Sequence, residues 1–583
     1  MAVDPSIKEE QIRLAEELLF SGAKLPSFAK GLYAGLFDAS RVFPFPQPSV
    51  EEEAALATFM THLRAFLDEH LDPDAIDRDA DIPDYVIKGL GELGLLSCTI
   101  DRAFGGLEFT QIMYCRAVEE VARRCAATAL FINAHQSIGM KALLLYGTQE
   151  QQDTWLRRLA TGDALAAFAL TEPQAGSDAA GVQTRAIFDA DKNVWVLNGE
   201  KQWITNGSIA HILTVMARTE INGQDKITAF LVTPDMPGFE VTAHALEKVG
   251  MRGSKTSKLR FTDMEVPAAN ILGKPGHGLK LALHVLDFGR TTFGSTCTGS
   301  AKYCVERAIA HAKTRYQFKQ PIGNFHLVKD KLARMAAYTY AMDSMTQLTA
   351  GLVDRGEDDY MLETAMLKVF SSDHQWEILY DTMQIFGGRS FFTDEPFERM
   401  MRDARLNPIG EGSNDVLRAF IGLVGMRDVG MRFKDVADNL RKPAVGLGKV
   451  FGLGKDSLRK FFVTPSIPVD SAQLQAEAKE LGERVRQFGL GVQRLIVHYK
   501  EGIMDEQLEL NRIAESAMAL YGVTAVLGRM DAELQQGRAM GTDLATGKLY
   551  CHLAFATIDR ELGALGGEKL DGEKKALADL LMG

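Results

Sequence analysis

Cysteine is scarce in this sequence, and the cysteines that occur show no pairing pattern. There are six in 583 residues, and no two have CxxC spacing. Such spacing indicates free thiols in a reducing compartment and argues against a disulfide framework or a zinc site. We therefore expect no metal and a cytoplasmic location.

Long apolar runs and an excess of positive charge are also missing. No uninterrupted apolar run is long enough to cross a bilayer, which disfavours an integral membrane protein. The formal net charge of -12 would repel a phosphate backbone, so we expect no nucleic acid partner. The first residues, MAVDPSIKEEQIRLAEELLF, carry acids where a targeting peptide needs bases, which predicts a prokaryotic cytoplasm or an already processed chain.

The strand–helix alternation of a dinucleotide-binding fold is absent too. No GxGxxG follows a predicted strand, so the sequence gives nicotinamide binding no support. Helical periodicity is found in VEEVARRCAATALFINAHQSIGMKALLLYG, whereas VWVLNGEKQWITNG, HILTVMART and ITAFLVTP read as short strands separated by turns. These patterns predict a mostly α-helical protein with a central, small antiparallel β domain.

The order of these patterns predicts six regions. They are an N-terminal extension (1–48), a helical domain (49–165), a middle β domain (166–275), a second helical domain (276–430), a basic linker rich in Gly and Pro (431–470) and a C-terminal helical domain (471–583).

Two short motifs lie in the predicted β domain. ALTEPQAGSDAAG places Thr171 and Ser177 around Gly176, and small hydroxyls with accessible main-chain N–H groups suit a flat cofactor rich in acceptors. An ST-turn between two domains is the alternative. QWITNG offers Trp203 and Thr205, although a single tryptophan in a β domain is more often part of the core.

A third motif, IGEGSND, sets Glu411 between Gly410 and Gly412, directly before an apolar helical pattern. A carboxylate between glycines suits a general base that a substrate must approach closely. The alternative is helix capping, because Ser413 and its neighbours are good N-cap residues.

Five motifs follow one another over roughly 250 residues: TEPQAGSD, WITNG, RYQFKQPIGNF, QIFGGRSFFTDEPFERMMRD and EGSND. In this order the sequence resembles the acyl-CoA dehydrogenase family. KGLYAGLFDASRVFPFP, NAHQSIGMKALLLYG and EGIMDEQLELNRIAESAMALYG resemble its very-long-chain branch, which has an additional C-terminal helical domain. The resemblance is weakest from about 434 to 471.

This resemblance implies a reaction and a base. Family members remove a proton beside a thioester carbonyl while FAD accepts a hydride from the next carbon. Glu411 matches the base, and its main-chain N–H would help to polarise the thioester oxygen. Arg252, in KVGMRGSKT, matches a basic position that orients the carboxylate, unless it is simply a surface arginine in a turn.

The resemblance also implies the residues that bind FAD. One subunit would contribute Phe168, Leu170, Thr171, Gly176, Ser177, Trp203, Ile204, Thr205, Ser413, Asn414 and Asp415. The other subunit of a homodimer would contribute Arg315, Gln317, Phe318, Phe325, His326, Gln384, Ile385, Phe386, Gly387 and Gly388. The guanidinium group of Arg315 suits a pyrophosphate.

Contacts to the acyl-CoA substrate are implied in the same way. They are Ser177, Asp287, Phe288, Gly289, Arg290, Gly410 and Gly412, although Arg290 could instead be solvated. The small residues Gly139 and Ala142 lie three apart on one helix face, which fits an extended acyl tunnel or close helix packing. The chain departs from the family at Gly410, where relatives carry an aromatic residue, and at Lys319 and Ser390, where they carry glycine.

The predicted linker contains a sequence pattern that suggests contact with a membrane. Between 441 and 463 basic residues alternate with Val, Leu and Phe, and a basic amphipathic stretch of this kind can lie on an anionic membrane. The long-chain relatives are peripheral membrane proteins. A flexible solvated linker is the alternative, since four glycines weaken any helix there.

The expected function is FAD-dependent α,β-dehydrogenation of long-chain acyl-CoA, the first step of fatty-acid β-oxidation, with electrons passed to an electron-transfer flavoprotein. One alternative is an acyl-CoA oxidase that uses oxygen. Another is a membrane-associated assembly or scaffold protein of the same fold.

Overall fold

The computed structural model describes residues 27–441, 463–538 and 541–583. The chain divides into two compact units. The first contains Pro48–Cys304 and Phe386–Glu411, and the second contains residues 27–47, Val305–Ile385 and Gly412–Gly583. The boundary thus falls directly after the glutamate of IGEGSND. Within the described ranges, no helix is long and apolar enough to span a membrane.

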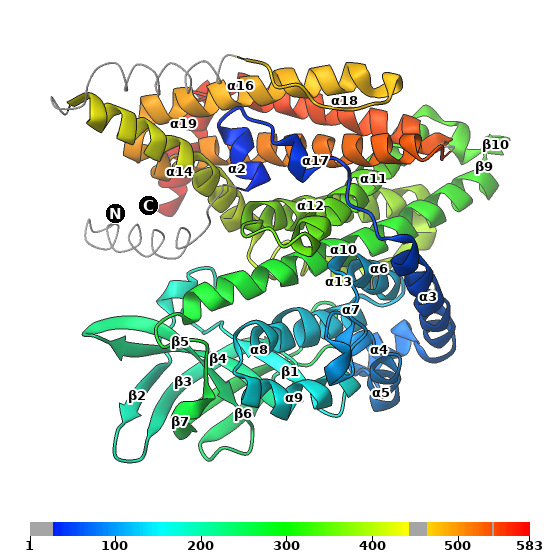
Figure 1. Ribbon diagram of the computed structural model, residues 1–583. Helices are drawn as coiled ribbons and strands as arrows, with labels where there is room; N and C mark the ends of the chain where they lie inside the picture. Colours follow the sequence, from blue (N-terminus) through cyan, green and yellow to red (C-terminus); the bar gives the residue numbers. More distant parts are fainter. Residues whose placement is uncertain (1–26, 442–462, 539–540) are drawn as a thin grey trace. The chain divides into compact units, whose positions relative to one another are not determined.

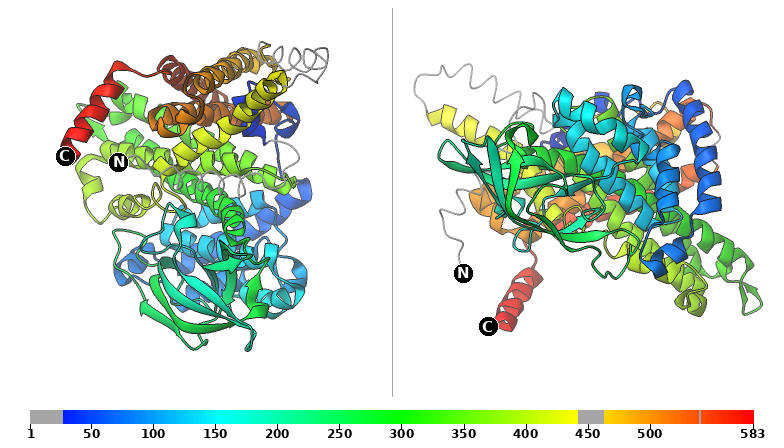
Figure 2. Two further views of the ribbon diagram at one scale, coloured as in Figure 1. Left: turned by 90° about the vertical axis from the view of Figure 1, so that its left-hand side faces the viewer. Right: turned by 90° about the horizontal axis from the view of Figure 1, so that it is seen from below.

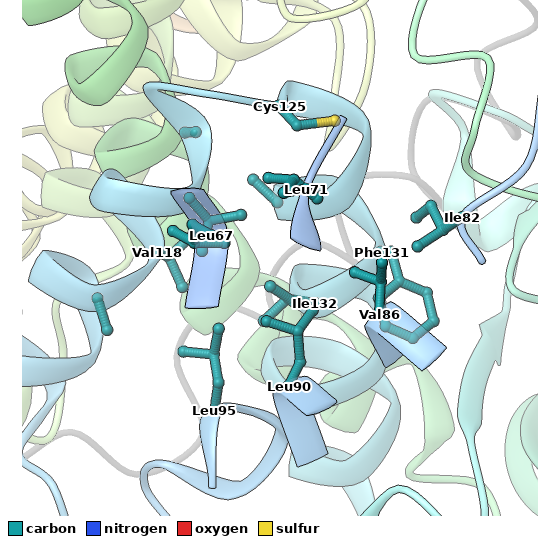
Figure 3. Close-up of a cluster of buried hydrophobic side chains, with 14 of the residues drawn as sticks. Leu67, Leu71, Ile82, Val86, Leu90, Leu95, Val118, Cys125, Phe131 and Ile132 are labelled. Atoms are coloured by element: carbon teal, nitrogen blue, oxygen red, sulfur yellow. The ribbon is translucent and has the colours of Figure 1, made fainter. Parts of the chain in front are cut away.

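Helices form one half of the first unit. They are α3 (Val50–His70), α4 (Pro73–Asp79), α5 (Asp84–Glu92), α6 (Gln111–Ala122), α7 (Ala126–Ile132), α8 (Lys141–Tyr146), α9 (Gln149–Thr161) and α13 (Phe397–Ala404). Ser49 and Glu52 form a capping box at the start of α3. Leu67, Val86, Val118 and Phe131 belong to one buried apolar cluster of these helices (Figure 3).

A π-helix, η4 (Asn133–Met140), interrupts the helical run between α7 and α8. The sequence there predicts ordinary helical periodicity, whereas the wider turn places residues four to five apart on one side. η4 packs on the first strand of the sheet. Such wide turns are rare, and they occur often at functional sites.

The sheet forms the other half of the first unit (Figure 1). Its strands are β1 (Ala166–Ala169), β2 (Arg185–Asp189), β3 (Val194–Thr205), β4 (Ile212–Ile221), β5 (Gln224–Val232), β6 (Phe239–Ala243), β7 (Thr256–Pro267) and β8 (Ile271–Leu272). Their order is β6-β7-β3-β2-β4-β5-β8, with β1 beside β4. β4 runs parallel to β1 and β2, so the expectation of a purely antiparallel sheet is wrong. Turn signals identify hairpins between consecutive strands, and β1 and β4 are not consecutive.

The described part of the second unit is helical apart from a small hairpin, β9 (Tyr316–Gln317) and β10 (Gln320–Pro321). Its helices are α2 (Phe28–Tyr33), α11 (His326–Asp354), α12 (Met361–Phe386), α14 (Asn414–Arg441), α16 (Gln475–Tyr499), α17 (Gln507–Gln535), α18 (Thr542–Gly563) and α19 (Lys569–Met582). α17 packs against α11, α14, α16 and α18. α19 extends away from the other helices of this unit (Figure 2).

One helix crosses the boundary between the units, and another crosses an expected domain boundary. α10 (Gly278–Thr314) begins in the first unit and ends in the second. α14 continues to Arg441, so the first eleven residues of the expected linker are helical. The basic stretch at 442–462 lies outside the described residues.

Candidate active site

Glu411 lies in the turn between α13 and α14, and its carboxylate packs against α10. The backbone of Glu411 is left-handed, with φ of 59°, and Gly412 follows with φ of 98°. A Cβ atom on Gly289 would lie 2.7 Å from Oε2 of Glu411. Because that distance is shorter than real Cβ contacts, glycine at 289 is what allows the carboxylate to occupy this position.

Helix capping does not explain Glu411. The main-chain N–H of Val416 lies 3.5 Å from the hydroxyl of Ser413, which is a cap contact of α14. The Glu411 carboxylate instead lies against α10. The geometry thus favours the general-base interpretation over the capping alternative.

Arg290 holds the main chain of Glu411. Its Nε donates to the Glu411 carbonyl at 3.3 Å, and its Nη1 pairs with Asp287 at 3.2 Å. Only 6% of Arg290 is exposed, so the alternative of a solvated arginine is wrong. Asp287 and Arg290 thus have a positioning role that the sequence did not predict.

Arg252 is the residue that the sequence assigned to orient the carboxylate. The structure leaves its side chain exposed and, among the described residues, shows no hydrogen bond between Arg252 and Glu411. The guanidinium group that reaches the main chain of residue 411 belongs to Arg290, and the role of Arg252 stays a prediction. The loop of Arg252 does pack on α13, where the main-chain N–H of Met251 donates to Asp403. Burial raises the pKa of Asp403 to about 6.

Lys368 of α12 fixes the segment that follows Glu411. Its Nζ donates to the carbonyl of Gly412 and to Oδ1 of Asn414, both at 2.7 Å. The amide of Asn414 donates to Ser372 and Asp373 in turn. Lys368 is fully buried within the apolar run MLKVF, and a lysine in such a run is the sequence signal that could have identified it.

The TEPQAGSD loop presents main chain and small groups. Phe168 and Leu170 are buried in the core, so they can offer a flavin only their backbone. Gly176 and Ser177 are exposed, and a Cβ on Gly176 would meet no atom within 4 Å. Thr171 is half-buried.

A buried ion pair that sequence reasoning missed anchors this loop. Nζ of Lys201 donates to Glu172 at 2.7 Å and to the Leu170 carbonyl at 3.0 Å. Glu172 also accepts from the main-chain N–H groups of Gln183 and Thr184. Burial lowers the pKa of Lys201 to about 8. Glu172 stands in the TEPQAGSD motif and Lys201 in β3, so a lysine inside a predicted strand was the available signal.

Trp203 is turned out of the sheet. The β3–β7 register shifts between Gln202 and Ile204, and Trp203 has φ of 58°. As a result 60% of Trp203 is exposed while Ile204 is buried, which excludes the core alternative for this tryptophan. An exposed indole beside Thr205 offers a flat aromatic surface to a cofactor.

The residues expected from a dimer mate are mostly exposed. Arg315, Gln317 and His326 are exposed, Phe325 is half-buried, and Phe318 is 86% exposed at the tip of the β9–β10 hairpin. Gln384 is exposed, whereas Ile385 and Phe386 are buried. At Gly387 and Gly388 a Cβ would meet no atom within 4 Å. Exposed donors and bare glycines are groups that suit a bound dinucleotide.

Gly139 and Ala142, which the sequence predicts to line an extended acyl tunnel, have a packing role. A Cβ on Gly139 would lie 2.9 Å from the Cβ of Ala166 in β1, so close packing explains this glycine. Ala142 is buried in the same apolar cluster as Ala166. Their part in an acyl tunnel stays a prediction.

Gly410 is different, because packing does not require it. A Cβ there would meet only Leu406, at an ordinary 3.6 Å. The structure therefore accepts a Cβ atom at this departure from the family pattern. Ser390 is accommodated by a hydrogen bond from its hydroxyl to the Gly387 carbonyl at 2.8 Å.

Metal ligands do not gather anywhere in the described part of the chain. All six cysteines are buried free thiols.

Family models match four segments of the chain. They describe the acyl-CoA dehydrogenase N-terminal domain (residues 53–163), middle domain (167–264) and C-terminal domain (276–425), and an ACAD9/ACADV C-terminal domain (472–579).

Individual proteins are similar over most of their length. The mitochondrial very long-chain specific acyl-CoA dehydrogenase of Mus musculus is 36% identical over 529 residues, covering 88% of this chain and 80% of the relative. The probable acyl-CoA dehydrogenase FadE10 of Mycobacterium bovis is 33% identical, covering 100% of this chain and 93% of the relative.

A solved structure supports the same family. The crystal structure of an acyl-CoA dehydrogenase complexed with FAD from Bacillus anthracis matches with a TM-score of 0.79 and 28% identity, covering 94% of each chain. The protein is an oxidoreductase with FAD as its cofactor. By family match, identity and fold, the chain belongs to the acyl-CoA dehydrogenase family.

Proposed function

We propose that the protein desaturates long-chain acyl-CoA thioesters to trans-2-enoyl-CoA, the first step of fatty-acid β-oxidation, with Glu411 as the base. The observation that carries this proposal is the Glu411 carboxylate, seated against Gly289 while Arg290 holds the carbonyl of the same residue. A carboxylate fixed in this way can meet a substrate proton without first reorganising.

The chain's own part in the reaction is binding, polarisation and proton removal. The main-chain N–H of Glu411 polarises the thioester oxygen, which makes the neighbouring C–H acidic, and a Glu411 carboxylate oxygen takes that proton. Bound FAD would supply the acceptor for the hydride that leaves the adjacent carbon. Trp203, Thr205 and the Thr171–Ser177 loop would hold the flavin, and Arg315 of a dimer mate would bind its pyrophosphate. The reaction balances, because two C–H bonds break while one C=C bond forms, and the proton goes to Glu411 while the hydride would go to FAD.

An anaerobic visible spectrum tests the function directly. The purified yellow protein should bleach on addition of palmitoyl-CoA and bleach more slowly with butyryl-CoA, and a colourless protein unable to take up FAD would contradict the proposal. The reduced protein should then pass electrons to an electron-transfer flavoprotein. Oxygen consumption with peroxide release would instead identify an acyl-CoA oxidase.

We also propose a homodimer in which the partner completes the FAD site. Exposed aromatic residues on and near the β9–β10 hairpin, namely Tyr316, Phe318 and Tyr380, support it, because exposed aromatic patches commonly mark interfaces. Phe318→Asp should give a monomer that loses FAD during gel filtration. A monomeric variant that retains FAD would exclude the shared site.

The location proposed is cytoplasmic, at the inner face of the membrane. Support comes from the composition of 441–463, where basic and apolar residues alternate. Deletion of this stretch should abolish co-sedimentation with anionic vesicles. Equal pelleting of the intact and shortened proteins would contradict membrane contact.

A further inference from the structure

Asn133, at the start of η4, is buried with an unpaired amide. It is only 1% exposed, and within the described part of the chain neither its Nδ2 nor its Oδ1 has a hydrogen-bond partner. Its neighbour Gln136 is partly paired, because its Oε1 accepts from the main-chain N–H of Cys98 at 2.6 Å, whereas its Nε2 has no partner in the described part of the chain.

Contacts along η4 and α10 lead from the catalytic carboxylate toward Asn133. A Cβ on Gly289 would touch both Oε2 of Glu411 and, at 2.9 Å, Cγ2 of Ile138 in η4. One turn farther along α10, Thr292 accepts a hydrogen bond from Ser137 at 3.0 Å. Asn133 lies four residues before Ser137, which is about one turn of a π-helix, so the two share a side of η4.

The other polar groups on this side satisfy one another. The hydroxyls of Tyr114 and Ser137 lie 2.9 Å apart, and Thr292 donates to the carbonyl of Phe288 at 3.1 Å. All three of these hydroxyl residues are buried. Asn133 is therefore the residue of η4 whose amide leaves both a donor and an acceptor unused, one helical turn beyond these hydroxyls, while Gln136 leaves one donor unused.

A buried amide without partners is costly, and in native proteins such groups are nearly always satisfied by protein, water or ligand. Asn133 offers both a donor and an acceptor. A hydroxyl group complements it, since a hydroxyl can accept from Nδ2 and donate to Oδ1. A pure hydrocarbon chain would leave both atoms unpaired.

We propose that Asn133 is a specificity-determining residue, which binds a hydroxyl group carried on the acyl chain beyond the two reacting carbons. This inference rests on the proposed dehydrogenation of acyl-CoA. It makes hydroxylated acyl-CoA thioesters the preferred class over unsubstituted chains of equal length. The acyl tunnel that the sequence predicts would then contain one polar group, the amide of Asn133.

The test uses the full-length FAD-bound enzyme and hydroxypalmitoyl-CoA thioesters that carry the hydroxyl at successive carbons from C5 outward. Anaerobic flavin bleaching gives kcat/KM for each thioester and for palmitoyl-CoA. We expect one hydroxyl position to exceed palmitoyl-CoA by about tenfold in the wild-type enzyme, the worth of one good buried hydrogen bond. Asn133→Leu, of similar volume, should reverse this preference by making palmitoyl-CoA the better substrate.

Thr128→Val is the matched control, since it also removes a buried polar group from the preceding helix, α7, and should leave the preference unchanged. If palmitoyl-CoA bleaches the wild-type flavin but no hydroxylated chain surpasses it, Asn133 is satisfied by water only and the inference is wrong. If no acyl-CoA bleaches the flavin, the proposed function itself fails and the inference falls with it. The wild-type series decides the question even if Asn133→Leu does not fold.

Discussion

At the scale of single residues, Glu411 adopts a backbone conformation that glycine would adopt more easily. Its φ of 59° costs a non-glycine residue about 1–2 kcal/mol. Arg290 on one side and Lys368 on the next peptide hold the turn in this state. The strained turn places the Glu411 carboxylate against α10.

Gly289→Ala tests the seat of that carboxylate. The added methyl group would lie 2.7 Å from Oε2, so the carboxylate must move. Because a displacement of about 1 Å can cost a factor of about 100, we expect kcat to fall tenfold to a hundredfold with FAD content unchanged. Gly430→Ala is the control, since a Cβ there meets no atom. Full activity in Gly289→Ala would show that the carboxylate position is unimportant.

The buried pair Glu172–Lys201 should matter more for stability and FAD retention than for the proton transfer. Lys201→Met leaves Glu172 buried without its cation, which should lower the free energy of unfolding by about 3–5 kcal/mol. Lys201→Met combined with Glu172→Gln should lose less, because no unpaired charge is left. Denaturant titration and the ratio of flavin to protein absorbance measure both effects. Equal losses in the single and double variants would contradict the electrostatic explanation.

At the scale of elements, the β9–β10 hairpin closes with two residues in left-handed conformation. Phe318 has φ of 49° and Lys319 has φ of 66°. Two-residue hairpin turns of this kind favour glycine. The departure from the family at Lys319 thus has a structural meaning, because the chain keeps a lysine where its backbone favours glycine.

Lys319→Gly should relieve this conformation. We expect the free energy of unfolding to rise by about 0.5–1 kcal/mol, after allowance for the greater entropy of glycine in the unfolded chain. Lys88→Gly in the middle of α5 serves as a contrast and should lose about 1 kcal/mol. A loss of stability in both variants would show that Lys319 is not strained. Thermal unfolding monitored by circular dichroism suffices.

The contact between α2 and α12 should be pH-dependent. Oε1 of the fully buried Glu363 accepts from the main-chain N–H of Ala29 at 2.8 Å, and Lys30 pairs with Asp359 at 2.7 Å. Burial, and secondly Asp359, raise the pKa of Glu363 to about 7 from 4.5. The native state therefore holds a proton that the unfolded chain releases, and the contribution of Glu363 to stability is lost as pH rises from about 4.5 through 7.

Glu363→Gln should abolish this dependence while keeping the acceptor for Ala29. In the wild type we expect the free energy of unfolding to fall by up to about 3 kcal/mol across that interval, beyond any slope that the variant retains. Denaturation midpoints at pH 5, 6, 7 and 8 provide the measurement. Parallel curves for the two proteins would contradict a buried, protonated Glu363.

The spacing of apolar residues located most helices and strands, but it did not predict the π form of η4 or the parallel pairing of β4 with β1. Apolar spacing places a helix at 133–140 but does not distinguish the π form, which depends on how η4 packs on β1. Alternation and turn residues place the strands but do not show that β4 runs parallel to β1. Both features depend on contacts between distant segments, which local patterns do not encode.

At the scale of the whole molecule, motif order predicted the family correctly, and the role of Glu411 as the base stays a prediction, whereas side-chain partners were less predictable. Glu411 could be chosen because its glycines and its neighbours in the chain mark it. Arg290 could not, since the contact of its Nε with the Glu411 carbonyl joins residues 121 apart. Lys201 and Lys368 could have been suspected as lysines inside apolar segments, but their partners depend on the fold, because these contacts join residues 29 to 46 apart.

The division of the chain falls within the IGEGSND motif. Glu411 ends one compact unit and Gly412 begins the other. The contacts of Arg290 fix the residue before the junction, and those of Lys368 fix the residue after it.

The most direct test of the central claim, that Glu411 removes the substrate proton, is rapid anaerobic mixing of Glu411→Gln with palmitoyl-CoA. Glutamine keeps the size and the main-chain contacts of residue 411 but cannot act as a base at neutral pH. The variant should retain FAD and its yellow spectrum, bind palmitoyl-CoA, and lose flavin bleaching by a factor of about 1,000 or more. Bleaching at the wild-type rate would show that another residue is the base.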